Sequence, residues 1–209
     1  MKKKLLLIGF LLLTLSTYSQ DNQIEFGIKG GLNYSSFMDN NDDDIPTDYK
    51  GQIGFHLGGF AKFKLSGKIS IKPELVYSLQ GSNFTINGSD LNIVSQDDIF
   101  ITSIDGEIKE SIILIPIILE YKLNKKLNLE FGPQFGYSLN RDVEYDNNPF
   151  NFIGFLRNDD EETFEIGIGL GFGYALSDDL GVSLRYNYGI IERQNLNTSV
   201  FQLGMYYKL

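Results

Sequence analysis

Apolar side chains alternate with polar or small ones in eight separate segments of the chain. In the segment 164–174, Phe164 and Ile166 begin an apolar face, while Glu165 and Gly167 begin a face that continues with glycines. The other alternating segments are 24–34, 52–65, 69–80, 113–122, 127–139, 181–190 and 201–209. Because successive side chains of a β-strand point to opposite faces, each segment predicts a strand with one apolar face and one polar or small face.

The connections between these segments alternate between short and long. The short ones are 66–67, 124–126 and 177–179, and the long polar ones are about 37–50, 81–110 and 140–161. Short turns at one end and long loops at the other are typical of barrels that span a bacterial outer membrane. A soluble β-sandwich also has alternating strands and is the alternative. The predicted fold is an all-β, transmembrane, antiparallel up-and-down β-barrel of eight strands.

The stretch 81–110 leaves open an alternative with ten strands. It contains two apolar groups, Phe84-Thr85-Ile86 and Ile99-Phe100-Ile101, which flank Asn87-Gly88 and other turn residues. These groups could form two additional strands. Because the apolar phase changes after Gly81, we favour an interpretation in which the third and fourth strands extend above the membrane.

The aromatic residues fall into two groups along the predicted strands. If the odd-numbered strands run outward, four tyrosines lie near the outer rim of the barrel: Tyr34, Tyr77, Tyr137 and Tyr188. Four further rings lie near the periplasmic rim: Phe63, Tyr121, Tyr174 and Tyr207. Amphipathic rings are enriched at both membrane interfaces, so the sequence predicts two aromatic girdles.

The first 19 residues have the composition of a cleavable signal peptide. Lys2–Lys4 form a basic start, Leu5–Leu15 is apolar, and small residues precede a cleavage site between Ser19 and Gln20. The apolar stretch is shorter than the ~20 residues of a membrane-spanning helix. We therefore expect cleavage rather than a membrane anchor, and an outer-membrane barrel domain at 20–209 in a Gram-negative bacterium.

The composition excludes several other classes of protein. The chain has no Cys, one His and a formal net charge of -9. Without Cys there is no disulfide, thiolate metal site or lipid-anchored cysteine. An acidic chain also lacks the basic footprint that nucleic-acid binding requires. We therefore expect no nucleic-acid partner.

The sequence contains no recognisable catalytic set. His56 lies on the predicted inward face of 52–65, and no second His is present to build a triad or a multi-His metal site. No Ser lies in a nucleophile-elbow motif. We expect no enzyme activity, no catalytic residue, no cofactor and no metal site, and interpret His56 as a hydrogen-bonded lumen residue. The acidic loop 39–44 could bind a divalent cation weakly, although Asp44 replaces the Gly of a calcium loop.

Charged side chains of both signs lie on the predicted inward faces. We interpret nine of them as a lumen charge network: Glu25, Lys29, Lys62, Lys72, Glu74, Glu120, Glu130, Glu165 and Arg185. The interior of an eight-stranded barrel is just wide enough to be filled by side chains, and buried charges must be paired. The sequence therefore predicts a salt-bridged lumen. The inward glycines of 164–174 favour a narrow channel instead, but we expect Arg185 and Tyr206 to reach into that gap.

The face of the strand on which a residue lies also predicts how two neighbouring positions respond to substitution. Leu170 is expected to face lipid and Gly171 the lumen. We therefore expect Leu170→Arg to harm assembly far more than Gly171→Ser, whose hydroxyl could find partners inside the barrel.

Five motifs resemble the PorT-like outer-membrane β-barrel family of Bacteroidetes, within the OmpA-type eight-stranded group. They are Phe26–Asn33, Lys72–Ser78, Ile115–Ile117, Phe131–Gly136 and Phe201–Leu209, where the last resembles a barrel assembly signal. The resemblance covers nearly all of the chain after the expected signal peptide. It implies the barrel architecture, and its family name suggests a role in protein secretion.

Three functions are compatible with these observations. We favour a structural or interaction scaffold, monomeric in outer-membrane lipid, whose polar external loops meet an envelope or extracellular protein. The first alternative is a narrow porin-like channel for ions or small solutes. The second is an accessory component of protein secretion, which only the resemblance suggests.

Overall fold

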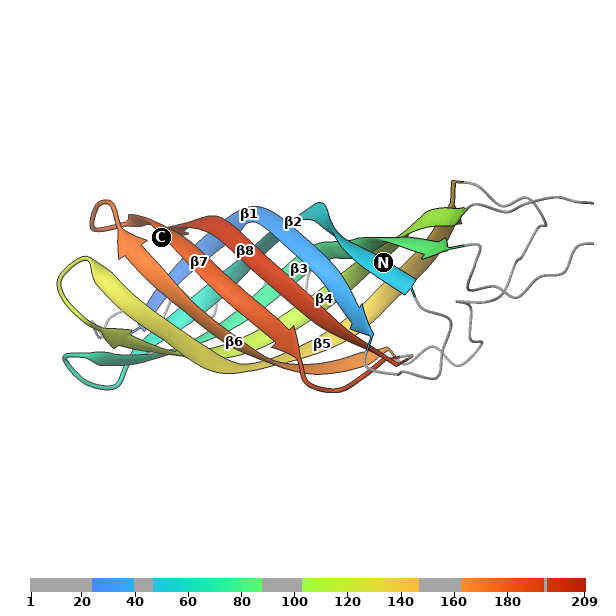
Figure 1. Cartoon of the computed structure of the whole chain (residues 1–209). Coiled ribbons are helices and arrows are strands. Elements are labelled where there is room, and N and C mark those ends of the chain that lie inside the picture. The colour runs from blue at the N-terminus through green and yellow to red at the C-terminus, as the bar shows by residue number, and fades with distance from the viewer. Residues whose placement is uncertain (1–23, 40–46, 88–102, 147–162, 194) are drawn as a thin grey trace, which may run out of the picture.

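The described residues form eight antiparallel strands that close into a barrel (Figure 1). The computed structural model describes residues 24–39, 47–87, 103–146, 163–193 and 195–209. The strands are β1 (Ile24–Asp39), β2 (Thr47–Lys64), β3 (Ile69–Asn87), β4 (Ser103–Lys122), β5 (Leu127–Tyr145), β6 (Phe164–Ala175), β7 (Leu180–Gly189) and β8 (Leu196–Lys208). Each strand pairs with its neighbours in the sequence, and β8 pairs back with β1. The predicted eight-stranded up-and-down barrel is confirmed.

Some sequence-based predictions concern residues outside this description. The expected signal peptide and its cleavage site lie there, as does the acidic loop 39–44 except for Asp39, the last residue of β1. The apolar group 99–101 also lies outside the described residues.

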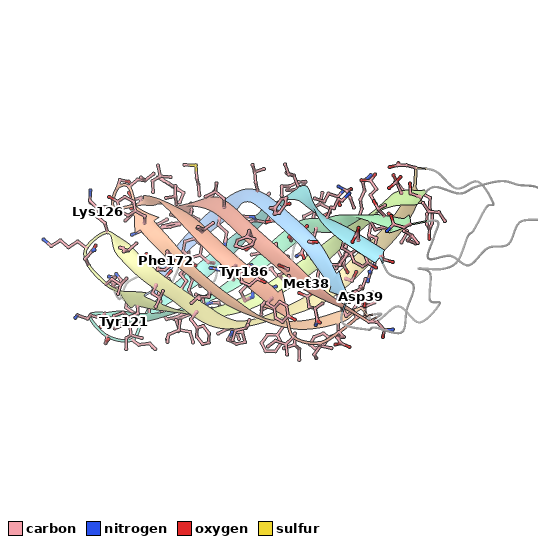
Figure 2. All side chains as sticks on the ribbon, in the orientation of Figure 1. Met38, Asp39, Tyr121, Lys126, Phe172 and Tyr186 are labelled. Atoms are coloured by element: carbon pink, nitrogen blue, oxygen red, sulfur yellow. The ribbon has the colours of Figure 1, made fainter. Side chains whose placement is uncertain are left out.

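Over most of its length the barrel is apolar on the outside and carries its buried charged side chains on the inside, the reverse of a soluble protein. Leu57 and Leu203 point outward and are 61% and 59% exposed, whereas Glu130 and Arg185 are 0% and 2% exposed. Figure 2 shows side chains projecting from the barrel along its length. An apolar shell of this extent is unfavourable in water and favourable in lipid, and a closed ring leaves no unpaired strand edge in the membrane. No helix among the described residues is long and apolar enough to cross a membrane.

Three short turns close one end of the barrel, which we call the turn end. Each turn is fixed by a side chain that accepts a hydrogen bond from the backbone N–H three residues later. Ser66 Oγ, Asn124 Oδ1 and Ser177 Oγ do so at 3.1, 2.9 and 3.1 Å. Such local bonds suit Ser and Asn to turns. We call the opposite end the loop end.

At the loop end, β3 and β4 form one continuous hairpin. Their pairing runs without a register shift from Ile69↔Tyr121 to Asn87↔Ser103. The group Phe84-Thr85-Ile86 therefore belongs to β3 and does not start an additional strand. This confirms the interpretation that the third and fourth strands are extended.

The strands reach further than the predicted segments, and this corrects the expected loops. The long polar stretches 37–50, 81–110 and 140–161 each contain residues that are in strands. β1 runs to Asp39, β2 begins at Thr47 and β5 continues to Tyr145. Outside the membrane, an outward-facing strand position is polar, so these residues lack the apolar alternation that marks the membrane segments.

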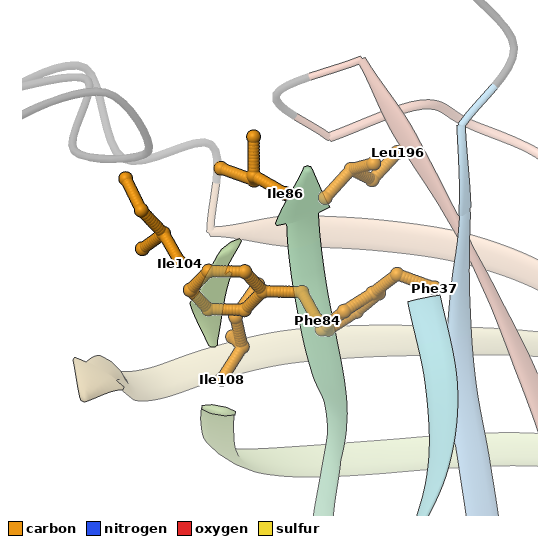
Figure 3. Packing of buried hydrophobic residues seen from close by; sticks show 6 residues of the cluster. All are labelled: Phe37, Phe84, Ile86, Ile104, Ile108 and Leu196. Atoms are coloured by element: carbon orange, nitrogen blue, oxygen red, sulfur yellow. The ribbon is translucent and has the colours of Figure 1, made fainter. Parts of the chain in front are cut away.

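An apolar cluster fills the interior near the loop end (Figure 3). This loop-end cluster consists of Phe37, Phe84, Ile86, Ile104, Ile108 and Leu196, all buried. Phe84 and Ile86 continue the inward face of β3 that carries Ser78 and Gln80 further down. The apolar phase changes after Gly81 because the inward face becomes apolar there while the outward face becomes polar.

Charged residues on the outer surface mark the part of the strands beyond the lipid. Lys109 Nζ donates hydrogen bonds to Glu107 at 2.5 Å and to Glu144 at 3.2 Å. The hydrogen bond from Lys109 lowers the pKa of the Glu107 carboxyl. Outward-facing charges are unfavourable in lipid, so this section of β4 and β5 projects from the membrane. We call it, with the adjoining residues of β2 and β3, the loop-end extension.

Candidate functional site

Charged side chains concentrate inside the barrel. All nine residues of the predicted lumen network face the interior and make ion pairs. Seven are buried, while Glu25 and Lys62 are half-buried near the turn end. The structure brings seven of the nine into one continuous cluster, and it places Glu25 and Glu165 in separate ion pairs. We call the first group the central cluster: Lys29, Lys62, Lys72, Glu74, Glu120, Glu130 and Arg185.

Arg185 on β7 is the centre of this cluster. Its Nη1 and Nη2 donate hydrogen bonds to the two oxygens of Glu74 on β3, at 2.9 and 2.8 Å. Its Nε and Nη2 donate to Glu130 on β5, at 3.1 and 2.6 Å. Lys29 Nζ donates to Glu74 at 2.8 Å. The planar guanidinium suits this bidentate geometry, and the contacts join opposite sides of the lumen.

Lys72 on β3 extends the central cluster toward the turn end. Its Nζ lies 2.7 Å from Glu130 and 2.5 Å from Glu120. Glu120 also pairs with Lys62. The central cluster therefore follows the barrel axis through alternating positive and negative groups.

Glu25 lies apart from the central cluster, at the turn end. Its carboxylate is 2.6 Å from Lys64 Nζ and 3.9 Å from Lys208 Nζ. The side chains of Glu25 and Lys64 are partly exposed, so these pairs contribute less than the buried ones.

A second buried group surrounds Arg193, which lies between β7 and β8. The guanidinium donates to both oxygens of Glu110, at 2.5 and 2.9 Å, and to Glu165 at 2.7 Å. Thr198 Oγ1 donates to the same Glu165 oxygen at 3.0 Å. Sequence reasoning missed Arg193 and Glu110. Glu110 has the same parity as the inward residues of β4, which could have identified it, but Arg193 lies in no alternating segment.

Arg141 on β5 covers the loop-end cluster. Its guanidinium carbon lies 4.8 Å from the ring centroid of Phe37. This is cation–π geometry. It places a positive group where the charged lumen meets the apolar cluster.

His56 takes part in a hydrogen-bonded group with Asn33 and Ser78. Its Nδ1 lies 2.8 Å from Asn33 Oδ1, and Asn33 Nδ2 donates to Ser78 Oγ at 2.8 Å. His56 is 2% exposed. The part of the chain that the structure describes contains no group of three or more His, Asp or Glu side chains placed to hold a metal ion.

The inward glycines of β6 leave no open space. A Cβ atom at Gly169 would lie 2.7 Å from Asn187 Oδ1 and 3.3 Å from Arg185 Cδ, because these side chains occupy the gap. Tyr206 lies over Gly181 on β7, where a Cβ atom would be 2.3 Å from the Tyr206 ring. Arg185 thus fills the gap as expected, while Tyr206 fills a different one.

The eight residues of the predicted aromatic girdles all face outward, and none is buried. Phe63, Tyr121, Tyr174 and Tyr207 are each the penultimate residue of their strand at the turn end. Tyr34, Tyr77, Tyr137 and Tyr188 lie on the four odd-numbered strands, which run toward the loop end. This arrangement is compatible with one ring of aromatic residues at each interface, and their role as girdles stays a prediction.

A closed ring of strands with a lipid-compatible exterior and a charged, filled interior defines a β-barrel of the outer membrane. Comparison with known families agrees: residues 18–194 match the family model described as outer membrane protein beta-barrel domain. The chain belongs to this family.

The fold is shared with Neisserial surface protein A at low sequence identity, and other solved barrels align with lower TM-scores. Neisserial surface protein A is 11% identical, with a TM-score of 0.53 over 88% of this chain and 97% of that protein. Ail of Yersinia pestis is 13% identical, with a TM-score of 0.46 over 90% and 99% of the two chains. OprG of Pseudomonas aeruginosa is 13% identical, with a TM-score of 0.45 over 88% and 95%. No curated protein matches the sequence.

Proposed function

We propose that this protein is a closed, monomeric scaffold of the outer membrane that presents its loop-end extension to a protein partner outside the cell. In this proposal the barrel is an anchor that neither conducts nor catalyses. The observation that carries it is the set of contacts from Arg185 to Glu74 and Glu130, which joins three strands across the lumen.

Two different barriers support a closed lumen. The central cluster fills the middle of the barrel, and the loop-end cluster fills the outer part with apolar side chains. Separating one partner from a buried ion pair costs about 3–5 kcal/mol. Opening a water path would require breaking several such pairs together, so spontaneous opening would be rare.

The shape of the loop-end extension supports a role in recognition. Short turns of outer-membrane barrels face the periplasm and longer connections face outward, so the extension would project from the cell. Its strands are continuous with the membrane barrel, and its outer surface carries the charged residues Glu107, Lys109 and Glu144. A rigid surface of this kind offers a partner a fixed pattern of polar groups.

Planar-bilayer recording on the purified protein tests the closed lumen. We expect no steady conductance steps under conditions in which a known porin conducts. Reproducible steps from this protein would replace the scaffold with the narrow channel. Cross-linking on intact cells, followed by purification, would then identify what contacts the extension, and capture of secretion components would favour the accessory role instead.

We also infer that the chain is a PorT-like protein of Bacteroidetes that is exported by the signal peptide at 1–19. The motifs that carry this resemblance and the basic, apolar and small-residue sections of the leader support it. Mass spectrometry of the protein from outer membranes should give a chain that begins at Gln20. A chain that retains Lys2–Lys4 would contradict cleavage.

A further inference from the structure

The turn end of the barrel contains a cavity of about 150 Å³. It is formed by the ends of the strands next to the short turns and by the turns that contain Asn124 and Ser177. We call it the turn-end cavity. Its lining is rich in lysine: Lys62, Lys72, Lys122, Lys125, Lys126 and Lys208. We propose that this cavity is a binding site for a phosphate group that enters from the periplasm.

The lysines of the cavity outnumber its carboxylates. The acidic lining residues are Glu25, Glu120 and Asp178. Glu120 already pairs with Lys62 and Lys72, and Glu25 with Lys64 and Lys208. The cavity therefore retains an excess of positive charge after its internal pairs are formed.

Three of the lysines supply that excess. Among the described residues, no ion pair neutralises Lys122, Lys125 or Lys126, which belong to the β4–β5 hairpin. Lys126 Nζ lies 6.0 Å from the ring centroid of Tyr174, a weak contact that leaves its charge available. Lysine binds phosphate as a flexible point charge, so three adjacent lysines can converge on one such group.

The cavity ends inside the barrel. Lys72 closes its inner side through the contacts with Glu120 and Glu130. Phe60 and Tyr206 form part of the lining, with ring centroids 6.3 Å apart and their planes nearly perpendicular. The space is sufficient for several water molecules or a group of similar total size. A ligand would therefore enter from the turn end and stop there.

The basic lining contrasts with the rest of the chain. The protein carries 27 acidic and 18 basic residues, so a lysine-rich cavity does not follow from its composition. An acidic molecule with one basic pocket concentrates anions at that pocket. The phosphate could belong to a soluble molecule of the periplasm or to the headgroup of a lipid in the adjacent leaflet. The proposal does not depend on the closed lumen or on a partner at the loop end.

Titration with inorganic phosphate tests the site, using isotope-labelled protein purified in a maltoside detergent, which contains no phosphate. At constant ionic strength, we expect saturable shifts of the backbone amide signals of Lys125, Lys126 and Asn128. The triple variant Lys122→Gln, Lys125→Gln and Lys126→Gln should bind at least about tenfold more weakly, because it removes the three unpaired positive charges of the cavity. Lys109→Gln, at the other end of the barrel, should bind like the unchanged protein.

A second arm distinguishes the two sources. If nanodiscs of phosphatidylglycerol move the same signals without added phosphate and prevent its binding, the ligand is the lipid headgroup. If phosphate still binds in these nanodiscs, the ligand is soluble. The proposal is overturned if neither arm moves these signals, or if the triple variant binds phosphate as tightly as the unchanged protein.

Discussion

Arg185 donates four hydrogen bonds to two buried carboxylates, Glu74 and Glu130. Lys29 and Lys72 also pair with them, but removal of Arg185 would leave both carboxylates buried with fewer donors. We expect Arg185→Met to lower the free energy of unfolding by about 3–5 kcal/mol, the usual cost of breaking a buried ion pair on one side. Urea unfolding in lipid vesicles, followed by the heat-modifiable mobility of the barrel on gels, measures this.

The matched control removes the charges together. Arg185→Met combined with Glu130→Gln removes a buried cation together with one of its carboxylates. Glu74 still pairs with Lys29 and Lys72, and Glu120 with Lys62 and Lys72, so this variant should recover part of the lost stability. If the single variant is as stable as the unchanged protein, the contacts of Arg185 do not hold the lumen together.

Leu170 faces outward and Gly171 faces the lumen, as predicted. The structure supports the harm expected from Leu170→Arg but not the mild effect expected from Gly171→Ser. Leu170 is 52% exposed on the outer surface, and Arg at mid-membrane costs about 2–4 kcal/mol. The expectation that Gly171→Ser is mild is wrong in physical terms, because a Cβ atom would lie 2.5 Å from the carbonyl oxygen of Leu184. We now expect Leu170→Arg and Gly171→Ser both to impair assembly.

Leu170→Ala is the appropriate control, since it keeps an apolar side chain at the same position. It should fold with nearly normal heat-modifiable mobility on gels. Normal folding of Leu170→Arg would show that this position does not face lipid, and normal folding of Gly171→Ser would show that β6 and β7 can separate slightly.

The same residues show what the sequence can and cannot reveal. Alternation identifies the direction of Leu170 and Glu130, because the strand backbone alone determines it. The space at Gly171 depends on how closely β7 approaches, and no local pattern records that distance. Arg193 lies outside every alternating segment, so its contacts with Glu110 and Glu165 depend on the three-dimensional path of the chain.

At the scale of elements, the pairing of β4 with β5 is irregular between the membrane barrel and the loop-end extension. Their register shifts between Ser111 and Ile112, which face Asn140 and Ser138. The shift changes the parity of β5, so that Val143 packs against the loop-end cluster. The composition of 140–161 suggested a loop, because a bulge interrupts the alternation by which strands are recognised.

The position of the loop-end cluster predicts separate behaviour of the extension and the membrane barrel. We expect Phe84→Ala to increase hydrogen exchange in 82–87 and 103–108 strongly, because loss of a core Phe costs about 3–5 kcal/mol. Insertion of the barrel and its heat-modifiable mobility should be preserved, since Phe84 lies beyond the charged lumen.

Asn83→Ala is the control for this experiment, because Asn83 is exposed on the same strand. It should leave exchange unchanged. If Phe84→Ala prevents barrel formation altogether, the extension and the membrane barrel fold as one unit.

At the scale of the whole molecule, the closure of the barrel can be tested directly. Leu32 on β1 and Leu203 on β8 are direct partners and both point outward. The chain has no Cys, so Leu32→Cys with Leu203→Cys would introduce a single pair. Opposite residues in a sheet have Cβ atoms about 4.5–5.5 Å apart, close enough to be joined by a short bifunctional cross-linker. We expect cross-linked protein only after folding, detected by its mobility on gels.

Leu32→Cys with Leu170→Cys is the matched pair, because β1 and β6 are not neighbours in the barrel. It should not cross-link within one molecule. Equal cross-linking of both pairs would contradict the strand order.

The overall architecture was predictable because it repeats: eight alternating segments give eight strands, and short turns place consecutive strands side by side. The residues proposed to carry the function follow no comparable repeat in the sequence. The contacts that close the lumen come from single residues such as Arg185, and the lysines of the turn-end cavity meet only after the strands have been arranged in a ring. Sequence periodicity therefore predicts the strands of the barrel much better than the side-chain contacts inside it.

The pairing of β1 with β8 also has a consequence for the order of folding events. Every other pair joins strands that are consecutive in the chain and can form as soon as a hairpin is made, whereas this pair joins Asp39 to Leu196 and Gly27 to Lys208. Contacts between distant parts of a chain form slowly. Until they form, the sheet has two unsatisfied edges in a solvent that cannot hydrogen-bond to them. The lifetime of that open sheet, rather than the strength of any hairpin, would set how often a newly made chain is lost to aggregation.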